Sequence, residues 1–439
     1  MPAVDSANVE AQVFAKLNAW GFTPGHNIGV AYSGGGDSTA LLALMLKWSD
    51  SGHVYAFIVD HALRSGSDKE AKLAEKRALA MGAQTKILTC QWPEGIPTTG
   101  IQEKARNARY QLLGDACREQ GIENLFLGHN HDDQAETVLM RQGAGSGWRG
   151  LAGIKCRNTA PIWPALQGVT ILRPMLDCGR EELRLYNKNN GLPWIDDPSN
   201  ENRSFARIRA RDYLTKHPSE RKNLLTISKA ATEVLSAERQ QILAFIRRAV
   251  KFYDWGGATL LPGFNTAGQG QIAEALKYLL PVISGEALPP GTEKRMNLAR
   301  RIRAQDFSGA TLGGVRLLPS KDGVLCVRDL GVLLGRKDVL AQSPLRLPPE
   351  QLQVWDGRFT VSTRQDDVVV DALGNWLEGL GESRKQLLAT IPEPVRGGLP
   401  VFIRAGKIAY IPFVDFAANT HGFHARALAS QRLQALLGE

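Results

Sequence analysis

Short apolar runs alternate with stretches of helical periodicity along the first 200 residues of the chain. Strands are predicted at Asn27–Tyr32, Val54–Val59, Gln84–Leu88 and Asn124–Gly128. Helices are predicted after them, at Thr39–Trp48, Asp68–Met81, Gln102–Gln120 and Asp133–Gln142. Regular alternation of this kind is typical of right-handed βαβ units, so we expect an α/β fold with a parallel, doubly wound sheet that helices cover on both faces.

The pattern changes after about residue 205. Helical, basic stretches follow there, including Glu238–Val250 and Gln271–Leu280. Further along, short apolar runs predict small strands at Gly314–Leu318, Gly323–Val327, Phe402–Arg404 and Lys407–Ile411, and Pro344–Pro349 is typical of a linker. We therefore predict three domains: an α/β domain over residues 1–204, a helical domain over 205–308 and a small α+β domain over 309–439.

Composition narrows the classes of protein to which the chain can belong. A chain of 439 residues is too long to fold around one ordinary hydrophobic core, so more than one domain is expected. Its 43% hydrophobic and 22% charged residues are typical of a globular protein. The sequence has no apolar run of about 18 residues, and its first 20 residues include Asp5 and Glu10 without an apolar signal core. The five cysteines form no CxxC pair, which argues against a disulfide framework or a zinc ribbon. We expect a cytoplasmic protein without membrane contact.

The net charge of +9 is concentrated in the middle of the chain. Residues 201–320 hold 19 Lys and Arg against 10 Asp and Glu, a difference of +9, whereas residues 1–200 give −1 and residues 321–439 give +1. A local basic excess attracts polyanions, of which nucleic acid is the commonest. A solvated basic helical face is the alternative interpretation.

A glycine-rich segment between the first predicted strand and helix indicates a phosphate site. Consecutive glycines let a backbone approach a phosphate closely, and a helix N-terminus adds a partial positive charge. The segment consists of Ser33, Gly34, Gly35, Gly36, Asp37 and Ser38. Asp37 suits a Mg²⁺ ligand that bridges to phosphate oxygens better than a direct phosphate contact. The alternative is an ordinary βα turn in which Asp37 or Ser38 caps the helix.

Two further polar segments also follow directly after predicted strands, and so they are expected at the same sheet edge. Asp60 and His61 follow the second strand. His129, Asp133 and Glu136 follow the fourth and are four and three residues apart, which is one helix face if the helix begins near His129. Two carboxylates there can hold an ammonium group. Alternatively, they form a capping box with Asp133 as N-cap and Glu136 three residues on.

Together these segments resemble a known family. The glycine-rich segment is similar to the pyrophosphate-binding loop (PP-loop) of the N-type ATP pyrophosphatases, and the set of motifs resembles the bacterial tRNA(Ile)-lysidine synthases in particular. The motifs occur in order over about residues 27–211, roughly half of the chain, with a further piece at Thr311–Gly314. They are Ser33–Ser38, Val59–Arg64, Gln102–Tyr110, Gly128–Thr137, Gly145–Gly147, Gly150–Leu151, Arg173–Met175 and Asp196–Asn200.

The resemblance implies a ligase that uses ATP and Mg²⁺. In such a reaction, O2 of the wobble cytidine of a CAU-anticodon tRNA(Ile) attacks the α-phosphate of ATP and releases pyrophosphate. The ε-amine of free L-lysine then displaces AMP from C2, which gives lysidine. The helical and C-terminal domains are expected to hold the tRNA.

The resemblance also assigns roles to individual residues. Ser33–Ser38, Asp60 and His61 are expected to contact the nucleotide, with Asp37 as the metal ligand. Arg109 is expected to reach the phosphate or the charge that develops during adenylation, because a planar guanidinium stabilises such charge. His129, Asp133 and Glu136 are expected to bind lysine. The predicted catalytic residues are Asp37, Arg109, Asp133 and Glu136.

The chain departs from the family pattern at two points. Gly143-Ala144 stands where the family has an Arg-Gly pair, and Ile208 replaces the middle residue of an Arg-Asn-Arg cluster. Arg141 and Arg149 are candidates to compensate for the missing arginine. Asp196–Asn200 is compatible with a simple Asx/Pro turn.

Three other functions are alternatives for a chain with this glycine-rich segment. A tRNA thiolase generally needs a reactive cysteine pair or CxxC ligands, and the cysteines here are not spaced for that role. A glutamine-dependent amidotransferase carries a glutaminase domain, and we expect none before Ser33. A non-catalytic RNA-binding protein that retains the nucleotide fold is the third. The carboxylates Asp37, Asp133 and Glu136 argue for retained catalysis.

Overall fold

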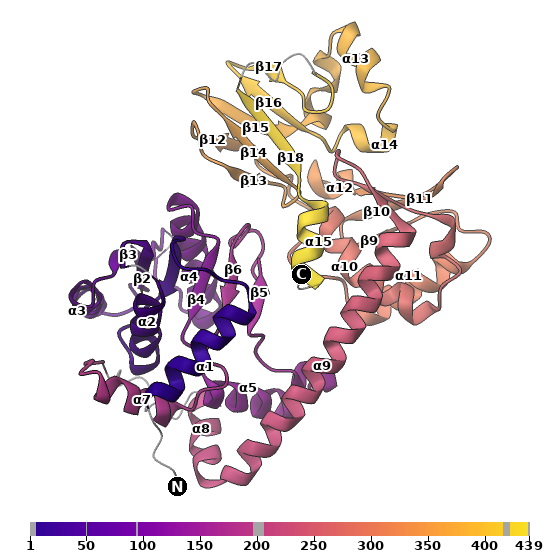
Figure 1. Cartoon of the computed structure of the whole chain (residues 1–439). Coiled ribbons are helices and arrows are strands. Elements are labelled where there is room, and N and C mark those ends of the chain that lie inside the picture. Colours follow the sequence, from indigo (N-terminus) through magenta and orange to yellow (C-terminus); the bar gives the residue numbers. More distant parts are fainter. Residues whose placement is uncertain are drawn as a thin grey trace. The chain divides into compact units, whose positions relative to one another are not determined.

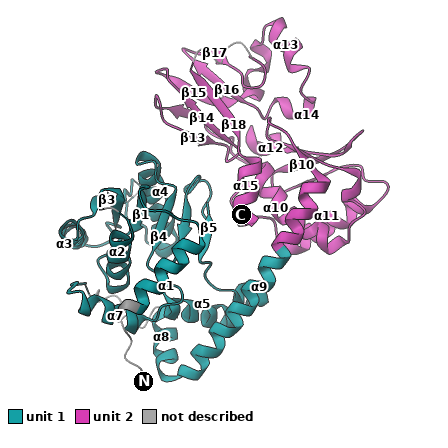
Figure 2. Cartoon of the chain, viewed as in Figure 1, with its two compact units in different colours: residues 1–238, 438 teal, residues 239–437, 439 magenta. Residues whose placement is uncertain are grey.

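The computed structural model describes residues 6–49, 51–93, 95–195, 206–336, 338–415 and 422–437. The chain forms two compact units, one within residues 1–238 and one within residues 239–437 (Figure 2). The boundary lies inside a single long helix, α9 (Pro218–Ala249). The predicted motif Asp196–Asn200 lies outside the described residues.

The first unit contains most of the α/β pattern that the sequence predicts (Figure 1). Its strands are β1 (Ile28–Ala31), β2 (Val54–Asp60), β3 (Gln84–Thr89), β4 (Asn124–Leu127), β5 (Arg157–Thr159) and β6 (Thr170–Leu172). Its helices are α1 (Ser6–Ala19), α2 (Gly36–Trp48), η1 (Ser51–His53), α3 (Ser67–Ala80), α4 (Ile101–Glu119), α5 (His131–Gly143), α6 (Trp148–Leu151), α7 (Arg180–Asn189), α8 (Ala206–Lys216) and the start of α9.

The six strands form one sheet in the order β3-β2-β1-β4-β6-β5. All neighbours pair in parallel except the edge strand β5, which pairs antiparallel to β6. Strand order reverses direction at β1, between β2 and β4, and ligands of open parallel sheets bind at such a switch point. The carboxyl ends of β1, β2 and β4 therefore lie side by side.

Side chains of alternate strand residues enter two separate cores, as the two-residue period of a strand requires. Val30 and Phe126 pack with residues of α1, α2, α3 and α7 on one face. Their neighbours Ala31 and Leu127 pack against α4 on the other face. Helices thus cover both faces, which confirms the predicted doubly wound α/β fold.

Helix α5 begins earlier than the sequence predicts. The N-cap is Asn130, not Asp133, because the Asn130 side chain accepts a hydrogen bond from the backbone N–H of Asp133 at 3.0 Å. The Asp133 carboxylate accepts from the backbone N–H of Asn130 at 3.0 Å and completes a capping box. His129 precedes the N-cap, so the prediction that it shares a helix face with Asp133 and Glu136 is wrong.

The second unit combines helices with antiparallel sheets, which confirms the predicted helical and α+β regions. Its helices are the end of α9, η3 (Pro262–Phe264), α10 (Gln269–Ser284), α11 (Thr292–Arg303), α12 (Leu330–Leu333), η4 (Leu373–Gly379), α13 (Glu382–Leu388), α14 (Glu393–Arg396) and α15 (Ala429–Leu437). Its strands are β7 (Val250–Phe252), β8 (Ala258–Leu260), β9 (Ala310–Leu312), β10 (Val315–Ser320), β11 (Gly323–Arg328), β12 (Leu345–Leu347), β13 (Gln353–Trp355), β14 (Phe359–Thr363), β15 (Val368–Ala372), β16 (Pro400–Arg404), β17 (Lys407–Tyr410) and β18 (Phe423–Ala427).

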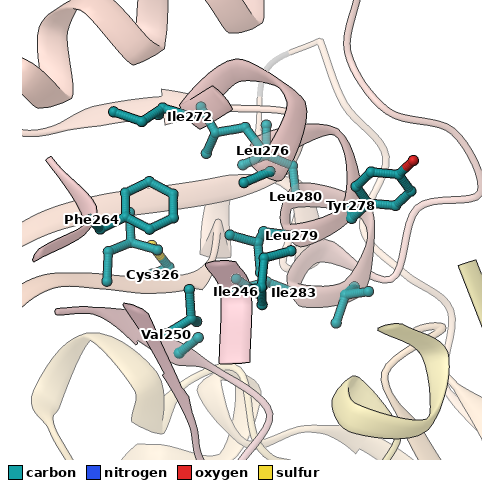
Figure 3. Packing of buried hydrophobic residues seen from close by; sticks show 14 of the residues in the cluster. Ile246, Val250, Phe264, Ile272, Leu276, Tyr278, Leu279, Leu280, Ile283 and Cys326 are labelled. Carbon is teal, nitrogen blue, oxygen red and sulfur yellow. The ribbon is translucent and has the colours of Figure 1, made fainter. Parts of the chain in front are cut away.

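A five-stranded sheet, in the order β7-β8-β11-β10-β9, packs with α9, α10, α11 and α15. Figure 3 shows the apolar side chains of α10, among them Leu276, Leu279 and Ile283, directed into this core beside Ile246 of α9 and Cys326 of β11. The sheets β12-β15-β16-β17 and β13-β14-β18 share another core. The three-part domain division, with its boundaries at 204/205 and 308/309, stays a prediction.

The linker predicted at Pro344–Pro349 is wrong, because residues 345–347 form β12. Leu347 is buried, and β12 pairs antiparallel with β15. Two leucines flanking Arg346 place both apolar side chains on one face of the strand, which outweighs the signal from the prolines. Within the described ranges, no helix combines the length and apolar character that a bilayer span requires.

One glycine fixes the packing of α4 against the loop before β6. A Cβ atom at Gly114 would overlap the carbonyl oxygen of Ala165, which also accepts a hydrogen bond from Arg118 at 2.9 Å. We predict that Gly114→Ala destabilises the first unit by about 1–3 kcal/mol and lowers its thermal unfolding midpoint. Gly143→Ala at the end of α5 is the matched control, because a Cβ there meets nothing within 4 Å. An unchanged midpoint for Gly114→Ala would contradict this account of the packing.

Candidate active site

A cavity of about 970 Å³ opens at the carboxyl ends of β1, β2 and β4. The polar segments that the sequence places after these strands all contribute to it: residues 33 and 35–38 after β1, His61 after β2, and residues 128 and 129 after β4. Helices α4, α7 and α8 supply further lining residues, most of them basic. The structure thus brings together the strand-end segments that the sequence predicts at one edge.

The glycine-rich segment forms a tight loop with backbone N–H groups at the start of α2. Gly34 has a φ of 79°, which favours glycine, and α2 begins after Gly35 without any side-chain cap. The Ser38 hydroxyl donates to the carbonyl of Gly35 at 2.9 Å, and lies 3.1 Å from the Ser33 hydroxyl. The alternative in which Asp37 or Ser38 caps the helix is therefore not realised. Uncapped N–H groups at a helix start suit an anion.

Asp37 occupies the first turn of α2 and lines the cavity. Burial raises the pKa of its carboxyl to about 6, and the Arg180 guanidinium, 3.8 Å away, lowers it only in part. A partly desolvated carboxylate that one guanidinium compensates only in part gains from a further cation. The described residues contain no group of three or more His, Cys, Asp or Glu with metal-ligand geometry. Asp37 is thus suited to Mg²⁺ that takes its other ligands from phosphates and water.

The segment after β2 is held by its own carboxylate. Asp60 is buried, and its Oδ1 accepts a hydrogen bond from the N–H of Ala62 at 2.9 Å. The backbone carbonyl of His61 accepts from the Trp92 indole N–H at 2.9 Å, and the pKa of the His61 ring is lowered by burial. Asp60 therefore shapes the turn, while His61 lines the cavity.

Two arginines of α4 face the cavity from the opposite side of the sheet edge. Arg106 stacks on the Tyr110 ring at 4.9 Å from its centroid. Arg109 is half-buried, and its Nε is a buried donor without a hydrogen-bond acceptor among the described residues. Because Arg109 also lines the cavity, an anion bound there would supply the acceptor that its Nε lacks.

His129 is held as a neutral ring by Arg173. The Arg173 Nε donates to the His129 Nδ1 at 3.1 Å, which leaves the ring proton on Nε2. Burial, reinforced by Arg173 and other arginines, lowers the pKa of His129 to about 3. The ring can therefore donate a hydrogen bond through Nε2 at neutral pH, but it cannot take up a proton there.

The carboxylates of α5 lie at the centre of an ion-pair cluster. Glu136 is only 1% exposed, and Asp133 is also buried. Arg207 and Arg211 of α8 each donate to Glu136 through Nε at 2.8 Å. Arg180 of α7 donates to Glu136 at 3.3 Å and to Asp133 at 3.0 Å. Despite burial, these arginines hold the pKa of Glu136 below its ordinary value. The carboxylates predicted to hold an ammonium are paired with guanidinium groups in this structure.

Sequence reasoning missed Arg180, which pairs with three predicted site residues, Asp37, Asp133 and Glu136. It begins α7 immediately after Gly179, and its backbone N–H donates to Asp132 at 2.8 Å. Glu181 and Glu182 follow Arg180 in the first turn of α7, so the sequence does not indicate that Arg180 pairs with distant carboxylates. The available signal was the position of Arg180 in a segment that follows β6 in the sheet.

Arg141 and Arg149, the two candidates to compensate for the missing arginine, both have structural partners. Arg141 donates to the carbonyls of Gly150 at 2.9 Å and Gly153 at 2.8 Å, so it organises the loop after α5. Arg149 pairs with Glu238 at 3.0 Å. Ile208 is buried, which suits its replacement of a polar residue.

The tautomer of His129 predicts its titration behaviour. Protonating Nδ1 would break the hydrogen bond from Arg173 and place two cations together. We expect the ring resonances of His129 to stay unshifted between pH 7.5 and pH 5 in a histidine ¹H–¹³C NMR titration, assigned with His129→Gln. A His129 midpoint above pH 5 would contradict the assigned geometry.

Comparison with known proteins identifies relatives of the whole chain and of its first domain. A family model described as a PP-loop domain matches residues 6–218. The tRNA(Ile)-lysidine synthase of Hyphomonas neptunium is 36% identical over 317 residues, which cover 70% of this chain and 82% of that protein. The enzyme of the same name from Caulobacter vibrioides is 32% identical over 378 residues, covering 86% and 84%. A solved structure of the U34-tRNA thiolase NcsA from Methanococcus maripaludis is 18% identical with a TM-score of 0.43, over 52% of this chain and 78% of that chain.

The similarity to the two synthases extends well beyond the ATP-binding domain and includes residues of both units. The thiolase likeness is too low in identity and TM-score to bear on activity. The chain belongs to the tRNA(Ile)-lysidine synthase family and carries its ATP-binding PP-loop domain.

Proposed function

We propose that this protein ligates L-lysine to C2 of the wobble cytidine of a CAU-anticodon tRNA(Ile), at the expense of ATP. The observation that carries the proposal is a cavity lined by an uncapped glycine-rich loop, by the arginines of α4, and by Arg180, Arg207 and Arg211, which pair with the carboxylates of α5. The loop accounts for nucleotide binding. The carboxylate–arginine cluster accounts for a second substrate, lysine, which carries both positive and negative groups. The family relationship supports a tRNA as the third.

Adenylation is assigned to the loop side of the cavity. The N–H groups of residues 33–38 bind phosphate oxygens, and Mg²⁺ held by Asp37 would neutralise charge on them. Arg109 stabilises the charge that develops when cytidine O2 attacks the α-phosphate. His129, as a fixed Nε2–H donor, contributes a hydrogen bond to an oxygen of the nucleotide or the cytosine rather than acting as a base.

The second step uses the carboxylates of α5. The lysine ε-nitrogen attacks C2, the C2–O bond to AMP breaks, AMP leaves with that oxygen, and the amine loses a proton. Asp133 and Glu136 bind the charged lysine, and its ε-ammonium gives up one proton before the nitrogen attacks. Because Arg180, Arg207 and Arg211 already pair with both carboxylates, an incoming ammonium has to replace at least one guanidinium. Lysine binding is thus an exchange of ion pairs and not an addition to an empty site.

The tRNA is assigned to the basic block of residues 201–320. Arg207 and Arg211 belong to this block but are committed to Glu136, so the phosphate contacts have to come from other members. Lys294, Arg300 and Arg303 of α11 are exposed, which makes them suitable. A cytoplasmic location, where tRNA is modified, remains a prediction.

The test is mass spectrometry of the wobble nucleoside after incubation of the protein with tRNA(Ile), ATP, Mg²⁺ and L-lysine. We expect cytidine to gain lysine less one water, with one AMP and one pyrophosphate formed per modified tRNA. Reactions without ATP or without lysine are the controls. A non-catalytic RNA-binding protein would bind the tRNA without AMP formation. A thiolase would add sulfur, although four of the five cysteines are buried and all are free.

Glu136→Gln should separate the two steps. The variant keeps the shape but removes a charge, and a charge-assisted hydrogen bond typically contributes about 1.5–3 kcal/mol, or about ten- to a hundredfold in affinity. We expect the apparent KM for lysine to rise by that factor, with adenylated tRNA accumulating at limiting lysine. The neighbouring Asp132→Asn is the control, because Asp132 pairs with Arg221. Blocked adenylation at saturating lysine would instead place Glu136 in the ATP site.

Removing three positive charges from α11 should weaken tRNA binding. The triple variant is Lys294→Gln/Arg300→Gln/Arg303→Gln. Each lost phosphate contact removes about one unit from the slope of log affinity against log salt. The affinity for ATP should not change. The matched control is Lys69→Gln/Lys72→Gln/Lys76→Gln, three exposed cations of α3 outside the basic block. Equal salt slopes for the two triple variants would contradict the assignment to α11.

A further inference from the structure

The cations that line the active-site cavity fall into two groups. Arg180, Arg207 and Arg211 pair with the buried carboxylates of α5. Arg184 and Lys188 of α7 also line the cavity, yet they take no part in that cluster. Arg184 has a 3.4 Å contact with Glu181, both largely exposed, and such a surface pair contributes little. Lys188 forms no ion pair with any described residue.

The two residues form a stripe with Arg180 on one face of α7. Residues 180, 184 and 188 are spaced by four, which places their side chains one above the other along the helix. All three line the cavity that contains the glycine-rich loop. The stripe therefore extends the positive wall of the cavity from the carboxylate cluster toward its mouth.

Helix α7 is fixed against the loop that it faces. The fully buried Asn187 donates through Nδ2 to the carbonyl of Gly36 at 2.8 Å. The segment after α7 returns to the same loop: the N–H of Ile195 donates to the carbonyl of Gly34 at 2.8 Å, and the Trp194 ring is near Gly36. The stripe is thus carried on a rigid element whose position is set by the loop itself.

We propose that Arg184 and Lys188 bind the β- and γ-phosphates of ATP and hold the pyrophosphate when it leaves. This inference rests on the proposed function. It assigns two further residues to the adenylation step of that reaction. When cytidine O2 attacks the α-phosphorus, the bond from that phosphorus to the bridging oxygen breaks, and its electron pair goes to the departing pyrophosphate. Two cations beside the loop stabilise this charge, while Arg109 acts from α4 on the α-phosphate.

The placement favours the polyphosphate of ATP over the tRNA backbone as the ligand. Arg184 and Lys188 flank Asn187, which contacts Gly36 at the start of α2, where the N–H groups are uncapped. A triphosphate bound at those N–H groups extends over only a few ångströms, so its terminal phosphates remain within reach of the long side chains of α7. The exposure of both residues leaves their charged ends free to move onto such a ligand.

The test compares ligands that differ in their phosphates. Binding of Mg²⁺-ATP, Mg²⁺-pyrophosphate and AMP to the full chain is measured by calorimetry for wild type and Arg184→Gln/Lys188→Gln. We expect the double variant to lose about ten- to a hundredfold in affinity for ATP and pyrophosphate, and less than about twofold for AMP, which lacks the β- and γ-phosphates. The control is Lys72→Gln/Lys76→Gln, an exposed pair at the same spacing on α3 that does not line the cavity.

Three outcomes overturn the proposal. Equal losses for ATP and AMP would assign the stripe to the nucleoside or to the fold. Unchanged ATP and pyrophosphate affinity with weaker tRNA binding would assign it to the tRNA backbone. Unchanged affinity for every ligand would show that Arg184 and Lys188 are part of a solvated helix face without a binding role. Failure of the proposed function is distinguishable, because wild type would then form no lysidine whichever way the binding comparison falls.

Discussion

The buried carboxylate of Glu136 is the interaction on which the arrangement of the site depends. It is 1% exposed, and it binds guanidinium groups from both α7 and α8. A carboxylate that deep is stable as an anion only when it is paired, because removing one partner leaves an uncompensated charge. The cluster therefore joins three helices at the edge of the sheet, and any ligand ammonium that enters has to satisfy the same requirement.

Because the buried carboxylates need paired cations, the basic residues that line the cavity fall into two groups. Arginines that pair with Glu136 and Asp133 are not available to a phosphate without breaking an ion pair. The basic residues outside the cluster, on α4 and along α7, keep their charge for an anionic ligand. The glycine-rich loop lies with both sets around one cavity, so the two halves of the reaction can share a site while using different side chains.

The sequence was sufficient for the features that depend on local pattern. The buried strand runs, the helix periodicity and the glycine-rich turn each follow from neighbouring residues, and the order of strands then brings Asp37, His61 and His129 together. Contacts between distant segments could not be predicted. Arg180 and Glu136 are 44 residues apart, and nothing in either segment indicates that they pair. The start of α5 was predicted wrongly because Asn and Asp are both good N-cap residues, so Asn130 and Asp133 were both candidates. Strand β12 was predicted as a linker because prolines flank it.

The hydrogen bond from Arg173 to His129 limits the chemistry that the cavity can perform. With Nδ1 occupied as an acceptor and the pKa lowered to about 3, the ring cannot remove the proton that the lysine amine loses. Its remaining Nε2–H can only donate, which suits an oxygen that gains negative charge, as the nucleotide oxygens do during adenylation. We therefore propose that His129 acts on the nucleotide side, with the loop and Arg109, and not in lysine binding as its place beside the carboxylates in the sequence predicts.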